Sequence, residues 1–76
     1  MKPRYKTIEE MEIAAGSSDD DECNMRLRSR EYNSTKVWLR VVWYSTGYRY
    51  YHDRMRRSDD INRDEAKQLI DAEWAQ

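Results

Sequence analysis

The chain has 76 residues, of which 38% are charged and 12% aromatic, and its net charge at pH 7 is −1. This length fits one domain, and no apolar run approaches the roughly 20 residues that cross a bilayer. Three Trp and six Tyr argue against a disordered chain, because disordered chains are poor in aromatic residues. We therefore expect a single small cytoplasmic domain over residues 1–76, with a frayed start at 1–6.

Charge is sorted along the chain. Residues 1–22 carry a balance of −4, residues 23–57 one of +7, and residues 58–76 again one of −4. Seven of the nine aromatic residues lie in the basic centre. A surface of mixed sign with exposed aromatic side chains is typical of a binding module.

The first predicted element is a short helix that begins after Thr7. Thr7 and Glu10 have the spacing of a capping box, and Gly16 is suited to end the helix. Three apolar residues share one helical face: Ile8, Met11 and Ala15. An extended conformation of the same segment is the weaker alternative. Residues 17–22 follow as an acidic loop, since four consecutive carboxylates repel one another and have no apolar neighbour to bury.

From Met25 the sequence period changes to two, which predicts a half-buried strand. Met25 and Leu27 point to its inner side. Three basic residues point to its outer side: Arg26, Arg28 and Arg30. Residues 33–35 have the composition of a turn.

Residues 36–45 form the strongest predicted strand. One face carries the apolar residues Val37, Leu39, Val41 and Trp43. The other face carries Trp38, Arg40, Val42 and Tyr44. Because both faces are rich in β-formers, we expect a central strand that is covered at least in part on both sides.

A hairpin connects this strand to a return strand over residues 48–55, and two registers compete. A three-residue loop, Ser45-Thr46-Gly47, places Tyr44 opposite Tyr48. A two-residue loop, Thr46-Gly47, places Arg40 opposite Asp53. We favour the first, because the second requires a positive φ at a threonine.

Residues 56–60 are predicted to be a linker, where the charge changes sign. A final amphipathic helix follows, with Asn62 and Glu65 spaced as a cap and its third residue. Its apolar stripe consists of Ala66, Leu69, Ile70 and Trp74. The predicted fold is therefore α+β, in the order α-β-β-β-α: a three-stranded antiparallel meander, with a short N-terminal helix and a C-terminal amphipathic helix packed on the sheet.

The sequence shows no residue pattern typical of a catalytic site, a metal site or a cofactor-binding site. His52 is the only histidine and Cys23 the only cysteine, so neither has a partner at ligand spacing. Carboxylates precede Cys23 and should raise the pKa of its thiol, which opposes nucleophilic activity. The acidic run lacks the alternation and glycine of a calcium loop, and the two glycines form no phosphate-binding loop. We expect a protein that is not an enzyme.

The function that we predict is docking onto a macromolecular partner. The predicted partner-binding residues combine the acidic run with sheet aromatics and one arginine: Asp19, Asp20, Asp21, Glu22, Trp38, Arg40, Tyr44, Tyr50 and Tyr51. The chain is similar in size, class and polarity, though not in any motif, to accessory proteins of phages and mobile elements. That similarity implies an inhibitor of a host nucleic-acid-handling complex, such as an anti-CRISPR protein, in which acidic residues compete with nucleic acid.

Two alternatives remain. In the first, the sheet binds single-stranded RNA or DNA, with contacts from Arg26, Arg28, Arg30, Arg49 and Arg54 beside Tyr50 and Tyr51. An overall acidic chain weighs against this alternative, and the arginines could instead pair with carboxylates of the final helix, Asp64, Glu65, Asp71 and Glu73. In the second, the chain is a structural homodimer.

Overall fold

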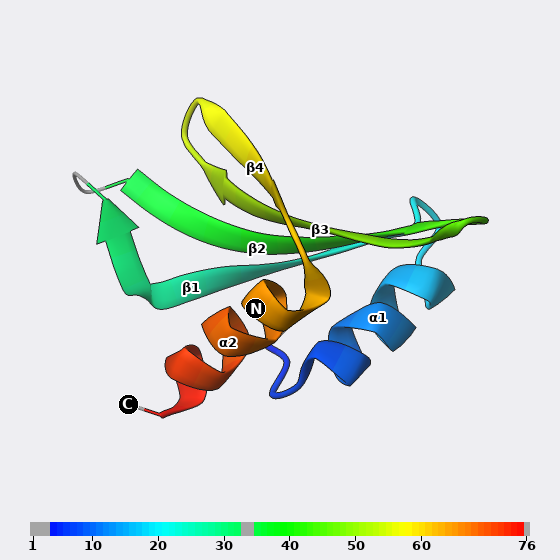
Figure 1. Ribbon diagram of the computed structural model, residues 1–76, viewed down its shortest axis with the longest axis horizontal. Coiled ribbons are helices and arrows are strands. Elements are labelled where there is room, and N and C mark those ends of the chain that lie inside the picture. The colour runs from blue at the N-terminus through cyan, green and yellow to red at the C-terminus, as the bar shows by residue number, and fades with distance from the viewer. Residues whose placement is uncertain (1–3, 33–34, 76) are drawn as a thin grey trace.

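The computed structural model describes residues 4–32 and 35–75; of residues 29–32 and 35 it describes the backbone alone. The elements are α1 (Ile8–Ser17), β1 (Glu22–Tyr32), β2 (Thr35–Tyr44), β3 (Gly47–Arg54), β4 (Arg57–Ile61) and α2 (Arg63–Trp74). The strands form one antiparallel sheet in the order β1-β2-β3-β4, and both helices lie on the same side of it (Figure 1). The predicted α+β class is confirmed, with four strands where three were expected.

α1 begins as predicted. The Thr7 side chain accepts a hydrogen bond from the Glu10 backbone N–H, while the Glu10 carboxylate accepts one from the backbone N–H of Lys6 and not of Thr7. Half of the predicted capping box is therefore formed. The three residues of the predicted apolar face are fully buried: Ile8, Met11 and Ala15. The helix continues one residue past Gly16, to Ser17.

β1 starts earlier than predicted, at Glu22, so the acidic loop between α1 and β1 is shortened to residues 18–21. Met25 and Leu27 face the core as predicted. The register of β1 against β2 shifts between Leu27 and Tyr32. The predicted turn at Asn33-Ser34 lies outside the described residues.

β2 is the central strand, but it is covered on one side only. Val37, Leu39 and Val41 are buried under the helices. Neither helix of the described chain packs on its other face (Figure 1). The other side, which we expected to be covered at least in part, has no helix on it because the apolar faces of both helices meet the same face of the sheet; Trp38, Arg40 and Val42 on that side are half-buried.

Both predicted registers of the hairpin between β2 and β3 are wrong. Tyr44 is paired with Gly47, and Ser45 and Thr46 alone form the loop. Asp21 is the only described non-glycine residue with a positive φ, so both loop residues have negative φ. The positive φ of 131° falls on Gly47 after the loop, where glycine carries little steric cost. The positive φ therefore falls on the glycine and not on Thr46, while the pairing differs from both predicted registers.

The predicted linker is a fourth strand. β4 pairs with β3 from Arg54↔Arg57 to Tyr50↔Ile61. The segment Arg57–Ile61 does not alternate apolar and polar residues. It forms a short edge strand because backbone pairing with β3 and ion pairs hold it in place. Ile61 is its one apolar contact with the core.

α2 closes the core. Asn62 and Glu65 form a complete capping box, as the spacing predicted. Ala66, Leu69 and Ile70 are buried. Trp74, predicted to belong to the same stripe, is 41% exposed, and its indole N–H donates to the Tyr5 carbonyl.

The N-terminal segment and α2 are joined at the edge of β1. The Arg4 guanidinium contacts the Glu73 carboxylate at 2.7 Å and also donates to the Arg26 carbonyl. Glu73 further accepts the backbone N–H of Arg28 at 3.0 Å. Residues 4 and 5, expected to fray, therefore take part in tertiary contacts.

Candidate docking surface

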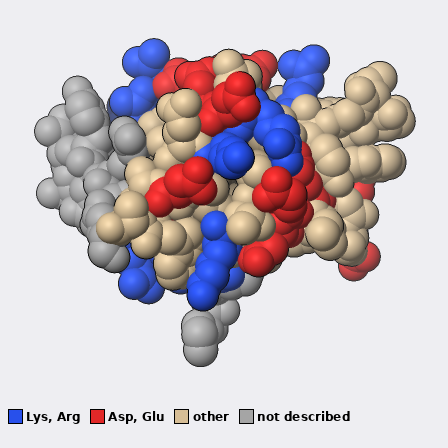
Figure 2. All heavy atoms as spheres, turned by 60° about the horizontal axis from the view of Figure 1, so that its bottom comes forward, with Lys and Arg blue, Asp and Glu red and all other residues tan. Residues whose placement is uncertain are grey.

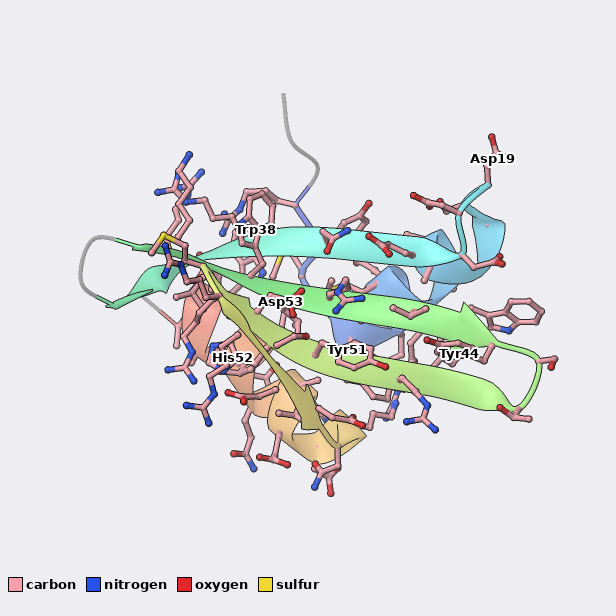
Figure 3. All side chains as sticks on the ribbon, turned by 90° about the horizontal axis from the view of Figure 1, so that it is seen from above. Asp19, Trp38, Tyr44, Tyr51, His52 and Asp53 are labelled. Atoms are coloured by element: carbon pink, nitrogen blue, oxygen red, sulfur yellow. The ribbon has the colours of Figure 1, made fainter. Side chains whose placement is uncertain are left out.

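The sheet face opposite the helices, called the open face below, is assembled by strand register. Three rows of residues cross it. They are Glu22–Val42–Arg49, Asn24–Arg40–Tyr51–Asp60 and Arg26–Trp38–Asp53–Ser58. Tyr44 extends the surface at the end of β2 and is 43% exposed. The predicted residues Trp38, Arg40, Tyr44 and Tyr51 therefore share one face (Figure 3).

Arg40 holds the centre of the open face together. Its guanidinium lies 4.3 Å from the centroid of the Tyr51 ring, a cation–π distance. It donates to the Asp53 carboxylate at 2.7 Å and to the Ser58 hydroxyl at 3.1 Å. Burial favours the neutral form of Asp53, but the hydrogen bonds from Arg40 and Ser58 outweigh it and lower the pKa of that carboxyl. The rejected register therefore identified a real ion pair, formed diagonally across β2 and β3.

A second, looser group lies toward the end of β2. The Arg49 guanidinium is 5.8 Å from the centroid of the Tyr44 ring and 3.4 Å from the Asp60 carboxylate. Arg49 and Asp60 are both 60% exposed, so this ion pair adds little to stability. It does place an aromatic ring beside a cation on an accessible surface.

The charges of the open face balance. Its cations are Arg26, Arg40 and Arg49, and its carboxylates are Glu22, Asp53 and Asp60. On the side that carries the helices, acidic and basic side chains are also interleaved (Figure 2). Neither surface presents the uniform positive charge that attracts a phosphate backbone.

The acidic loop lies at the end of the sheet where β2 meets β3. The backbone carbonyl of Asp21 accepts a hydrogen bond from Trp43 N–H at 2.8 Å, which ties the loop to the end of β2. Asp19 projects from that end (Figure 3). Asp20 is held by the Ser18 hydroxyl. The loop therefore lies at the same end of the sheet as Tyr44.

Trp43 belongs to this end and was missed. The sequence pattern assigned it to the core, but it is 40% exposed because it lies at the strand terminus, next to the turn. Its position directly before that turn is the signal that could have identified it.

Tyr50 does not belong to the surface. It faces the helices, is 7% exposed, and its hydroxyl donates to the Glu12 carboxylate. Arg63 at the start of α2 contacts the same carboxylate at 2.8 Å, so these three side chains connect both helices to β3. The assignment of Tyr50 to a partner or nucleic-acid site is therefore wrong: register places it opposite Val41, in the core.

The predicted nucleic-acid residues are not gathered on one face. Arg26 and Arg49 lie on the open face, whereas Arg54 contacts Asp59 at 2.8 Å at the far end of the sheet. Arg28 is exposed at the edge of the sheet. The side chain of Arg30 lies outside the described residues.

No cluster of three or more His, Cys, Asp or Glu side chains that could hold a metal occurs among the described residues. His52 is half-buried and paired with Leu39 and Asp59 in the sheet. Cys23 is buried, and burial raises the pKa of its thiol, only partly offset by a hydrogen bond with Tyr5. The predicted direction is confirmed, but its main cause is burial, not the preceding carboxylates.

Neither helix of the described chain has the length and apolar character needed to span a membrane. Comparisons with protein-family models, with curated proteins and with solved structures give no match.

Proposed function

We propose that this protein is a non-enzymatic docking module that binds a protein partner through the open face and the adjoining acidic loop. One observation carries the proposal: both helices cover the same side of the sheet, so that Trp38, Val42, Tyr44 and Tyr51 lie on a face that neither described helix covers. A contiguous aromatic surface on a domain of this size is typical of an interaction site.

The chemistry of the face favours a protein over nucleic acid. Trp, Tyr and Arg are the residues enriched at the energetic centres of protein interfaces. Arg40 is already paired with Asp53 and stacked on Tyr51, so it is rigid before binding and loses little side-chain entropy. The balanced charge of the face gives a phosphate backbone no net attraction.

The acidic loop suggests the kind of partner. Asp19, Asp20 and Asp21 lie at the same end of the sheet as the exposed residues Trp43 and Tyr44, and the Asp21 backbone is hydrogen-bonded to that of Trp43. Carboxylates next to aromatic anchors suit a basic groove, of the sort that nucleic-acid-handling proteins present to phosphates. In this form of the proposal the protein inhibits such a complex by occupying that groove.

The test uses a double variant, Trp38→Ala with Tyr44→Ala, and a partner captured from host lysate and then purified. Two anchors of about 2 kcal/mol each make the affinity of the variant roughly 100-fold or more weaker. Ile13→Ala is the matched control, because Ile13 is a large apolar residue, 69% exposed, on α1. Circular dichroism confirms that all variants are folded.

Equal affinity of the double variant and the wild type for the purified partner would refute docking through the open face. Capture is carried out in nuclease-treated lysate, so that a protein held only through nucleic acid is not counted as the partner. Charge reversal of Asp19, Asp20 and Asp21 to Lys tests the acidic loop separately. Slower association with a basic partner is the expected result, and an unchanged rate removes the loop from the site.

A further inference from the structure

The antiparallel meander places basic residues at one end of the sheet and the acidic loop at the other. β1 and β3 end where β2 and β4 begin, so the basic residues around these positions meet at one end. This basic end consists of Arg28, Lys36, Arg54, Arg56 and Arg57. The acidic loop lies at the opposite end, and in Figure 3 nitrogen-tipped side chains gather at the end away from Asp19.

Positive charge at the basic end exceeds negative charge. Asp59 contacts both Arg54 and Arg57 at 2.8 Å, so two guanidinium groups share one carboxylate. Lys36 and Arg56 are exposed and contact no carboxylate within the described part of the chain. Asp53 also lies at this end, but it is paired with Arg40. With that pair counted as neutral, the five cations and Asp59 leave a surplus of four positive charges among the described side chains of this end, although the whole chain has a net charge of −1.

The basic end adjoins a hollow on the surface. This shallow hollow of about 450 Å³ lies beside the turn between β3 and β4 and reaches onto the open face. Its cations are Arg40, Arg54, Arg56 and Arg57, and its lining also includes Asn24, Ser58 and the carboxylates of Glu22 and Asp53. Guanidinium groups bind phosphate oxygens through paired N–H donors. Three inter-strand spacings of about 4.8 Å make the end roughly 14 Å wide, which is enough for more than one phosphate.

We propose that the basic end is a binding site for the phosphate backbone of nucleic acid. The site adjoins the open face, because Arg40, Asp53 and Ser58 line the same hollow, but it uses neither of the aromatic anchors Trp38 and Tyr44, so the two proposals can be tested independently. Contacts are with phosphates and not with bases, because the residues of this end are cations and the exposed side chain of Met55. Binding is therefore independent of sequence and depends strongly on salt.

The expected dependence of the binding constant on salt can be calculated from the number of phosphate contacts. Neutralising four phosphates of a single strand gives a slope of log K against log salt of about −2.8, from a slope of about −0.7 per contact. Affinity then falls about 50-fold between 50 and 200 mM salt. The probe is a fluorescein-labelled 20-nucleotide single-stranded DNA, and fluorescence anisotropy at four salt concentrations measures the slope.

Lys36→Gln with Arg56→Gln is the decisive variant, since neither side chain contacts a described carboxylate and the fold does not depend on them. Removing two contacts should halve the slope, to about −1.4, and weaken binding at least tenfold at 50 mM salt. Arg49→Gln with Lys67→Gln removes the same net charge away from the basic end and should leave the slope unchanged. The variant with alanine at Trp38 and Tyr44 should bind this probe like the wild type, so each proposal can fail without the other.

Three results would overturn the proposal. One is no binding of the oligonucleotide at 50 mM salt, and another is an equal effect of the two glutamine double variants. The third is competition by poly-glutamate as effective as that by unlabelled oligonucleotide at equal charge, which would identify an acidic protein as the better ligand.

Discussion

Glu73 is the buried charge on which the stability of this fold should depend most. Its side chain is 2% exposed, and its carboxylate accepts hydrogen bonds from the Arg4 guanidinium at 2.7 Å and the Arg28 N–H at 3.0 Å. Glu73→Ala leaves a cation and an edge N–H without this acceptor. Arg4 is 23% exposed and recovers some hydration, so we expect a loss of about 3 kcal/mol, at the lower end for a broken buried pair.

That loss is large for a chain of this length. At roughly 0.05–0.15 kcal/mol per residue, the whole domain is stabilised by about 4–11 kcal/mol. Urea unfolding followed by tryptophan fluorescence measures the effect. With a denaturant slope of about 1 kcal/mol per M, the midpoint should fall by about 3 M. Glu73→Gln keeps an oxygen acceptor and should lose about half as much.

Asp71→Ala is the control, because Asp71 is an exposed carboxylate on the same helix and its substitution should change stability by less than about 0.5 kcal/mol. A midpoint for Glu73→Ala within about 0.5 M of that control would refute the reasoning. The contacts between the N-terminal segment, α2 and β1 would then contribute nothing to stability.

Two further predictions concern buried polar groups. Tyr50→Phe removes the hydrogen bond to Glu12 and should cost about 1 kcal/mol at pH 7. Burial and the Glu12 carboxylate raise the pKa of Tyr50, so the folded state keeps this proton more tightly than the unfolded state. The stability that this proton contributes is complete below pH 10 and is lost as the pH rises above 10. Between pH 8 and pH 11, the free energy of unfolding measured in urea should therefore fall more for the wild type than for Tyr50→Phe. Equal decreases for the two proteins would contradict this. Cys23 is buried with a raised pKa, so a colorimetric disulfide reagent should label it slowly in the native protein and rapidly in urea; equal rates would mean that β1 is not covered at this position.

Local sequence patterns were sufficient for the positions of the two helices and for the inner faces of β1 and of most of β2, but not for Trp43, Tyr50 or Trp74. The Asn62 cap, the buried face of α1 and the alternation that buries Leu39 follow from spacing alone. Such features are determined by neighbours within a few residues in sequence, which is why they could be predicted. The strand over Arg57–Ile61 could not be, because pairing with β3, and not its own composition, makes it a strand.

The candidate site depended on register, and one residue of slip decides which face a side chain occupies. Tyr50 and Tyr51 are adjacent, equally aromatic and equally favourable in a strand. Only the pairing of Val41 with Tyr50 places the first in the core and the second on the open face. The same register brings Arg40 over the Tyr51 ring.

The sequence by itself determined the α+β class, the helix caps, the residues that must be buried and the separation of charge into three blocks. Tertiary structure decided that both helices lie on one side of the sheet, that Glu73 is buried against the edge of β1, and that the basic residues meet at one end while the acidic loop lies at the other. The reason is the range of the interactions. Caps and periodicity act within a turn or two of chain, whereas the covered face, the strand register and the distribution of charge in space depend on contacts between residues far apart in sequence.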